Sequence, residues 1–275
     1  MKLSKIHALW FSGTGTTEKV VRTIAAEMAK RLSVPVETVD FTTPAGREAV
    51  STFAEDELTI VGTPVYAGRV PNVLLPYLTE KLKGGGGPAI PVVLYGNRNF
   101  DDGLIELRNL LQENNFRTIA AAGFIGEHSF SRVLAAGRPD QADLAIVTAF
   151  AQQAAEKLER MEGLPDEPVQ VRGETPLRPY YKPRDRQGSF INILKVKPVT
   201  DMEKCDNCGL CAKLCPMGSI DVADVSNIKG ICIKCCACVK KCHKDAKYFT
   251  DEGYLYHRHE LEEGYARRAE PELFF

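Results

Sequence analysis

The placement of cysteine constrains this chain more than any other feature of its sequence. All nine cysteines of the 275-residue chain lie between Cys205 and Cys242, and the first 204 residues contain none. Disulfide frameworks are typical of small secreted proteins. Residues 1–10 contain two lysines but no long apolar stretch, so we expect no secretory signal there. The crowded block therefore predicts metal or cluster ligation rather than disulfide bonds.

The cysteine block is one unit written twice. The first run is Cys205-x2-Cys208-x2-Cys211-x3-Cys215-Pro216, and the second is Cys232-x2-Cys235-x2-Cys238-x3-Cys242. Each cysteine of the first run recurs 27 residues later in the second. Four thiolates at this spacing are the ligands that a [4Fe–4S] cubane requires. A pair of zinc sites is the alternative, but zinc usually takes two CxxC pairs separated by a longer loop.

Residues 199–248 resemble the bacterial two-cluster ferredoxins, in which the fourth cysteine of each run binds the other cluster. The resemblance implies one cluster on Cys205, Cys208, Cys211 and Cys242, and another on Cys232, Cys235, Cys238 and Cys215. Two residues depart from the pattern. His243 replaces the expected proline, and we interpret it as a surface residue or an outer hydrogen-bond donor. Cys236 is a ninth cysteine, which we expect to be no ligand because its use would break the repeat.

Residues 1–163 alternate between strand and helix signals. Apolar or β-branched runs predict strands at 5–11, 34–41, 58–62, 90–95 and 118–124, and apolar periodicity or a leading proline predicts helices at 17–32, 45–53, 71–82, 101–114 and 139–161. This alternation predicts an α/β fold with a five-stranded doubly wound parallel sheet. Ligands of such sheets bind beyond the carboxyl ends of the strands.

The remaining segments differ in composition. Residues 164–198 contain six prolines and predict an extended linker. From Arg172 to Lys197, seven basic residues stand against two acidic ones, which indicates either a solvated linker lying on the domain surfaces or a basic strip that meets an acidic partner or a bound cofactor. Residues 249–275 are rich in aromatic residues, so we expect this C-terminal tail to dock on a domain, because disordered tails are poor in them.

A loop rich in glycine and threonine follows the first predicted strand and opens the first predicted helix. It reads Ser12-Gly13-Thr14-Gly15-Thr16-Thr17. Small residues let backbone N–H groups surround a phosphate at the positive end of a helix, and hydroxyls add further donors. The loop has neither the lysine of a Walker motif nor the dinucleotide GxGxxG spacing. It therefore predicts a monophosphate site, with a plain Ser/Thr-capped turn as the alternative.

This loop, with Glu18 after it, resembles the phosphate loop of flavodoxins, which bind FMN. Together with the cysteine block and residues 126–131, it makes the whole chain resemble the fused flavodoxin–ferredoxin proteins of anaerobic bacteria and archaea. The resemblance implies a flavodoxin-like FMN domain over 1–163 and a small α+β ferredoxin domain over 199–248. It assigns the phosphate to Ser12, Thr14, Thr16 and Thr17 with the amides of Gly13 and Gly15. It assigns the flavin ring to Thr63, Pro64, Val65, Tyr66, Ala67 and Gly68, and to Asn97, Arg98, Asn99 and Phe100, with Tyr66 or Phe100 stacking on it.

Two arginines in the ring loops depart from this resemblance, since flavodoxins have acidic loops there. Arg69 and Arg98 would stabilise an anionic reduced flavin, so we do not expect a very low reduction potential. Packing of Tyr66 within its loop and a surface ion pair for Arg98 are the alternatives. We interpret His128 as a hydrogen-bonded loop histidine rather than an acid catalyst.

The overall charge and hydropathy narrow the function further. A net charge of −1 gives no support to nucleic-acid or membrane-surface binding, and no apolar run approaches the ~18 residues of a membrane span. We expect a cytoplasmic electron-transfer protein that passes electrons between FMN and two [4Fe–4S] clusters and so couples one- and two-electron redox partner proteins. The alternatives are an FMN-dependent reductase of a quinone, nitro compound, disulfide or metal ion, and an electron-entry subunit of a larger redox complex. No residue is predicted to be catalytic.

Overall fold

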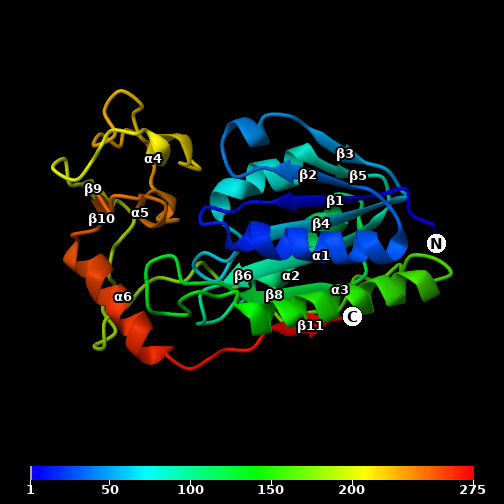
Figure 1. Ribbon diagram of the computed structural model, residues 1–275. Helices are drawn as coiled ribbons and strands as arrows, with labels where there is room; N and C mark the ends of the chain where they lie inside the picture. The colour runs from blue at the N-terminus through cyan, green and yellow to red at the C-terminus, as the bar shows by residue number, and fades with distance from the viewer. Residues whose placement is uncertain (1) are drawn as a thin grey trace.

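The computed structural model describes residues 2–275 and confirms the doubly wound parallel sheet (Figure 1). Its five parallel strands are β1 (Lys5–Trp10), β2 (Val36–Asp40), β4 (Glu57–Pro64), β6 (Pro88–Tyr95) and β8 (Ala121–Ile125). They lie in the order β2-β1-β4-β6-β8. This is the flavodoxin-like order, in which ligands bind where the direction of winding reverses.

Helices cover both faces of this sheet. On one face α1 (Thr16–Leu32) packs beside α3 (Gln141–Arg160), and on the other lies α2 (Gly103–Glu113). Adjacent strand residues point to opposite faces, so Ile60 joins the core under α1 and α3 while Val61 joins the core under α2. Both faces are apolar, which is why the central strands are hydrophobic almost throughout.

One predicted helix is confirmed with an irregular geometry, and another is wrong. The stretch 71–82 is helical from Asn72 to Lys81, where a 3₁₀ turn at Asn72–Leu74 passes through Leu75 and Pro76 into a π-helical turn at Tyr77–Lys81. Pro76 lacks the N–H that a regular α-helix needs at that position. The stretch 45–53 has only a 3₁₀ turn at Ala45–Arg47 and then β3 (Ser51–Phe53), which pairs with β5 (Leu82–Gly84). The predicted strand at 118–124 is split between a short β7 (Arg117–Thr118) and β8.

The cysteines belong to a separate lobe, which we call the cysteine lobe (residues 199–248). It contains two short helices, α4 (Leu210–Lys213) and α5 (Ala237–Lys240), and an antiparallel pair, β9 (Val199–Thr200) with β10 (Lys247–Tyr248). Figure 1 shows this lobe beside the end of the sheet at which the parallel strands finish. The lobe therefore lies where an α/β sheet of this kind binds its ligands.

The linker and the tail hold the two halves together. In the linker, Arg178 pairs with the buried Asp102, and Arg186 pairs with Glu260 and Glu263 of α6 (Glu252–Gly264). The acidic groups that the basic strip meets thus include residues of this chain. The tail docks as expected: after α6 it adds β11 (Glu272–Phe274) antiparallel to β8, as an edge strand that the sequence did not predict. None of the helices within residues 2–275 has the length and hydrophobicity to cross a membrane.

Candidate functional site

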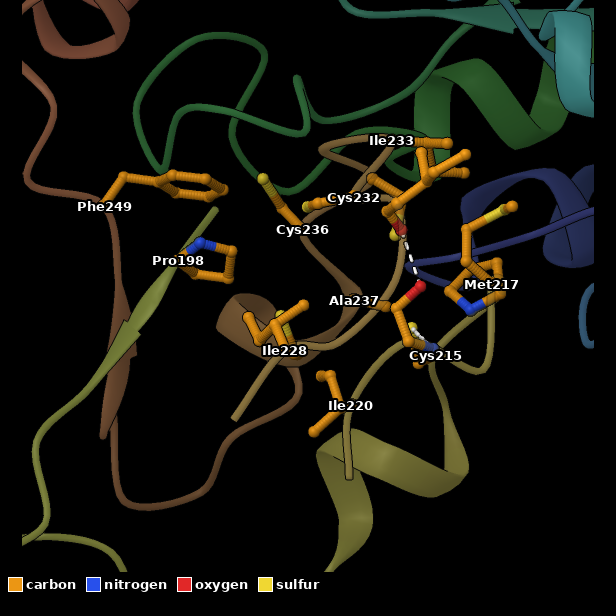
Figure 2. A pocket seen from close by; sticks show the side chains of 15 residues that line it. Pro198, Cys215, Met217, Ile220, Ile228, Cys232, Ile233, Cys236, Ala237 and Phe249 are labelled. Atoms are coloured by element: carbon orange, nitrogen blue, oxygen red, sulfur yellow. Dashed lines mark hydrogen bonds between the residues drawn. The ribbon is translucent and has the colours of Figure 1, made fainter. Parts of the chain in front are cut away.

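Two cavities in the cysteine lobe collect the cysteines into two groups. One cavity is lined by Cys215, Cys232, Cys235, Cys236 and Cys238, together with apolar side chains such as Ile220, Ile228 and Phe249 (Figure 2). The other is lined by Cys205, Cys208, Cys211 and Cys242, and Cys238 also borders it. The fourth cysteine of each run thus lies with the first three of the other run. This is the crossed grouping that the resemblance implies.

The 27-residue repeat is visible in the backbone as well as in the cysteines. Left-handed residues recur at equivalent positions: Asn207 and Lys234, Gly209 and Cys236, and Gly218 and Asp245. The amide of Ser219 donates to Cys215 Sγ at 3.4 Å, and the equivalent amide of Ala246 donates to Cys242 Sγ at 3.4 Å. Each run therefore bends its chain in the same way around its sulfurs, which is the donor set and the geometry that a cubane needs.

The ninth cysteine occupies the position that glycine has in the first run. Cys236 precedes α5 as Gly209 precedes α4, and both adopt the left-handed conformation. Its Sγ lies 3.4 Å from the hydroxyl of Tyr254, and its side chain packs with Ile193 and Phe249. Its sulfur thus has partners of its own, in keeping with the expectation that Cys236 is no ligand. His243 bonds Asp206 at the surface, 2.8 Å from Nε2 to the carboxylate.

The two runs differ in their exposure. Cys208 of the first run is exposed, whereas its equivalent Cys235 is 8% exposed. Burial, together with the nearby sulfurs of Cys236, Cys232 and Cys215, raises the pKa of Cys235 to about 12. Burial likewise raises the pKa of Cys238, with the sulfurs of Cys235, Cys232 and Cys215 adding to the effect. A buried group of thiolates of this kind needs a bound cation or cluster to be stable.

The predicted phosphate loop lies between β1 and α1. Gly15, at φ +97°, turns the chain into the helix, and Ser12 Oγ accepts the N–H groups of Gly15 and Glu18. Thr14 and Thr16 are partly exposed at the mouth of the loop, while Thr17 is buried. Because Ser12 accepts both bonds, its hydroxyl proton stays available to donate. The amide of Gly15, which was predicted to hold the phosphate, is thus already bonded to Ser12. The hydroxyls of the loop and the amide of Gly13 remain as donors at the positive end of a 17-residue helix.

Of the two predicted ring loops, the first contacts the cysteine lobe. Tyr66 is desolvated, which raises its pKa well above its usual range, and the thiols of Cys235, Cys236 and Cys232 contribute to that rise. Its backbone is held by reciprocal bonds with Arg69. The neighbouring Ala67 accepts the N–H of Tyr181 from the linker. Thr63 is wholly buried in the sheet, and Pro64, Val65 and Gly68 complete the loop.

The second ring loop is less open than predicted. Phe100 is wholly buried against Tyr95 and Gly123, so it is not placed to stack on a flavin. Asn97 is also buried, because the tail covers it: its side-chain amide donates to the carbonyls of Tyr265 and Arg267. Asn99 accepts the N–H of Asp101 with its side chain. Of the two predicted stacking aromatics, Tyr66 therefore has the better position.

The positive charge predicted for the ring loops is compensated. Arg69 forms a two-pronged ion pair with the buried Glu106. Arg98 pairs with Asp101, and its guanidinium lies 4.9 Å from the ring centre of Tyr181. Neither arginine is an isolated cation, so the expected shift of the flavin potential loses its basis.

His128 is a loop histidine with a depressed pKa. Desolvation, with the nearby cations Lys240 and Arg98, lowers its pKa to about 3. Its Nδ1 accepts the N–H of Phe130, and its ring packs on Gly96, where no side chain would fit. The imidazole is neutral at physiological pH, which fits a structural role in the loop better than that of a proton donor.

Direct contact between the cysteine lobe and the phosphate loop is the feature that the sequence did not predict. A Cβ built on Gly13 would lie 3.2 Å from the Cβ of Cys235. Lys240 of α5 donates to the carboxylate of Glu127 and to the carbonyls of His128 and Ser131. No local pattern announces such contacts, because they join residues more than 100 positions apart.

Comparison with known proteins supports this two-part organisation. The family model for the 4Fe-4S binding domain matches residues 198–221. No curated protein matches the chain.

Solved structures similar to this chain include two flavodoxins and a flavin reductase. A flavodoxin from the Archaea is 15% identical, with a TM-score of 0.42, over 57% of this chain and 99% of its own. A Streptococcus pneumoniae flavodoxin is 18% identical, with a TM-score of 0.39, over 56% of this chain and 99% of its own. The NADH:FMN oxidoreductase EmoB is 17% identical, with a TM-score of 0.40, over 60% of this chain and 92% of its own. The assignment of the fold rests on the strand order β2-β1-β4-β6-β8. The chain thus joins a flavodoxin-like domain to a 4Fe-4S binding domain.

Proposed function

We propose that this protein transfers electrons between a redox partner protein and FMN through two [4Fe–4S] clusters, and that the cluster of Cys232, Cys235, Cys238 and Cys215 is the one beside the FMN. The single observation that carries the proposal is the contact of the phosphate loop with a cysteine of the second run, Gly13 against Cys235. Two carriers that were merely tethered would have no reason to share such a contact.

The residues of the chain would divide the work between them. The four cysteines assigned to each cluster all line its cavity and would supply the four thiolates of a cubane. The hydroxyls and amides of residues 12–17 match a phosphate dianion in charge and shape. When bound, the clusters carry single electrons and FMN takes up two, so the assembly converts between one- and two-electron chemistry.

The different exposure of the two cysteine runs indicates which cluster would receive electrons from a partner protein. Cys208 of the first run is open to solvent, whereas Cys235 is covered by the flavodoxin-like domain. An outside protein would therefore exchange electrons with the cluster of Cys205, Cys208, Cys211 and Cys242, and the second cluster would connect that cluster to FMN.

The coverage of the ring loops favours a carrier over a reductase. The linker bonds Ala67 through Tyr181, and the tail bonds Asn97 through the carbonyls of Tyr265 and Arg267. A small acceptor would need these segments to move before it could reach a flavin between the loops. The reductase and the subunit of a larger complex remain predictions of lower rank.

The first test of the proposal is composition. The protein purified without oxygen should bind FMN more tightly than riboflavin, which lacks the phosphate, and contain about eight irons. Thr14→Val and Thr17→Val should each weaken FMN binding by ~1.5–3 kcal/mol, as for a hydrogen bond to a charged group. Equal affinity for FMN and riboflavin would contradict the assignment of the phosphate loop.

The second test is kinetic. The protein is mixed rapidly with reduced methyl viologen, a one-electron donor, at less than one electron per molecule. Electrons that arrive at the clusters should then reach the flavin in a phase whose rate does not depend on protein concentration. Cys215→Ser should abolish that phase while the first cluster still accepts electrons. A rate proportional to protein concentration would mean that electrons pass between molecules.

A further inference from the structure

The basic side chains in the first two turns of α1 have partners other than the phosphate loop. Lys19 donates its ammonium to the carbonyl of Pro139. Arg22 pairs with Glu18 and lies over the ring of Trp10, 4.4 Å from its centre. The loop therefore offers neutral donors and a helix end to a group that carries nearly two negative charges at neutral pH.

A lysine from the cysteine lobe lies over this loop. The ammonium nitrogen of Lys241 is 3.4 Å from the position that a Cβ on Gly15 would occupy. The backbone of Lys241 is fixed, because its N–H bonds the carbonyl of Ala237 at the end of α5. Within residues 2–275 no hydrogen bond or ion pair holds its ammonium group.

The repeat marks this lysine as a departure from the duplicated unit. The equivalent position in the first run is Leu214, which carries no charge, whereas the preceding lysines, Lys213 and Lys240, are equivalent to each other. At this position a cation is present only in the second run, whose Cys235 contacts the phosphate loop. Glycine at position 15 leaves room between that cation and the loop.

We propose that Lys241 supplies the cation for the FMN phosphate, so that both halves of the chain bind the cofactor. This inference rests on the proposed FMN site and adds a residue from outside the flavodoxin-like domain. Lys241 also lines the cavity of Cys205, Cys208, Cys211 and Cys242. FMN binding would therefore fasten the cysteine lobe onto the loop, and undocking of the lobe would weaken FMN.

The test is a titration of the full-length, cluster-containing protein with FMN and with riboflavin. Lys241→Gln should raise the Kd for FMN roughly five- to tenfold at low salt, a range between that of a charged hydrogen bond and that of an exposed ion pair. The Kd for riboflavin should stay the same. Lys241→Arg should restore FMN binding, and the effect of Lys241→Gln should shrink at about 1 M salt, where the screening length is ~3 Å.

Lys244→Gln is the matched control, because Lys244 lines the same cysteine cavity and lies two residues beyond Cys242. It should leave both affinities unchanged. An unchanged Kd for FMN in Lys241→Gln would overturn the inference, as would equal losses for FMN and riboflavin, which would indicate damage to the ring site. A wild-type protein that does not distinguish FMN from riboflavin would instead contradict the phosphate loop itself.

Discussion

The two cysteine runs have the same spacing and the same backbone turns, yet they lie in different surroundings. Asn207 and Gly209 have the same left-handed conformation as Lys234 and Cys236, so the local sequence sets the same geometry twice. The first run faces solvent at Cys208, and the second packs against the phosphate loop at Cys235. Local spacing therefore decides what each run can bind, and the docking of the lobe decides which neighbours it serves.

The difference in the surroundings of the two runs matters because the second run lies at the ligand-binding edge of the sheet. The carboxyl ends of parallel strands collect the loops that bind ligands. The second run lies at that edge, where Lys240 holds it to Glu127. Arg47 donates to the carbonyl of Pro216 and so also holds the end of the first run, beside Cys215, whose sulfur lies with the second group. Cys235 of the second run is thus buried against the phosphate loop, whereas Cys208 of the first run stays exposed to an outside partner.

The largest effect is expected from replacing the fourth cysteine of each run. Cys215→Ser should remove the cluster of the second run, and Cys242→Ser should remove that of the first, so each variant should lose about half of the iron. Paramagnetic spectra of the reduced variants identify which cluster remains. If each serine variant lost the cluster of its own run, the crossed grouping in the two cavities would be contradicted.

The cysteine spacing and the strand–helix alternation predicted most of the fold correctly, because both are local patterns in the sequence. The spacing places three sulfurs of each run around one cavity, and the last cysteine of the other run completes the group. The wrong helix at 45–53 shows where local signals fail, since β3 pairs with β5 across 31 positions. The burial of Asn97 by the tail and the contact of Gly13 with Cys235 also join distant residues. The candidate ring site was therefore predicted less well than the cysteine groups.

The two clusters should lose their iron at different rates, because solvent reaches the first run more easily than the second. An iron chelator added under oxygen-free conditions should remove iron in two phases of about equal size, the first from the cluster that includes Cys208. We expect roughly a tenfold difference in rate, because release from the second run requires local opening that costs about 1.4 kcal/mol or more. The measurement is absorbance of the iron–chelator complex against time, with the two single-cluster serine variants as references. A single phase would indicate equal exposure of the two clusters.

Two equivalent lysines allow the contact of the lobe to be tested. The side chain of Lys240 is 10% exposed and donates to Glu127, whereas Lys213 at the equivalent position of the first run is exposed. Lys240→Met should weaken docking by ~1.5–3 kcal/mol, because it removes a charged hydrogen bond and leaves Glu127 without its cation. Hydrogen exchange of the amides at residues 12–17 should accelerate roughly tenfold or more. Lys213→Met should leave that exchange unchanged, and equal effects of the two variants would contradict a docked lobe.

The smallest expected effect concerns the one position at which the two copies exchange cysteine for glycine. Left-handed backbone costs a non-glycine residue ~1–2 kcal/mol, so Gly209→Ala should destabilise the first run by about that amount. Cys236→Gly relieves the same strain but gives up the contact of its sulfur with Tyr254, so the two changes should nearly cancel. Iron and sulfide content should stay at the wild-type level in Cys236→Gly, because its sulfur faces Tyr254 and the repeat supplies eight other cysteines. Loss of about four irons in that variant would make Cys236 a ligand and would end the equivalence of the two runs.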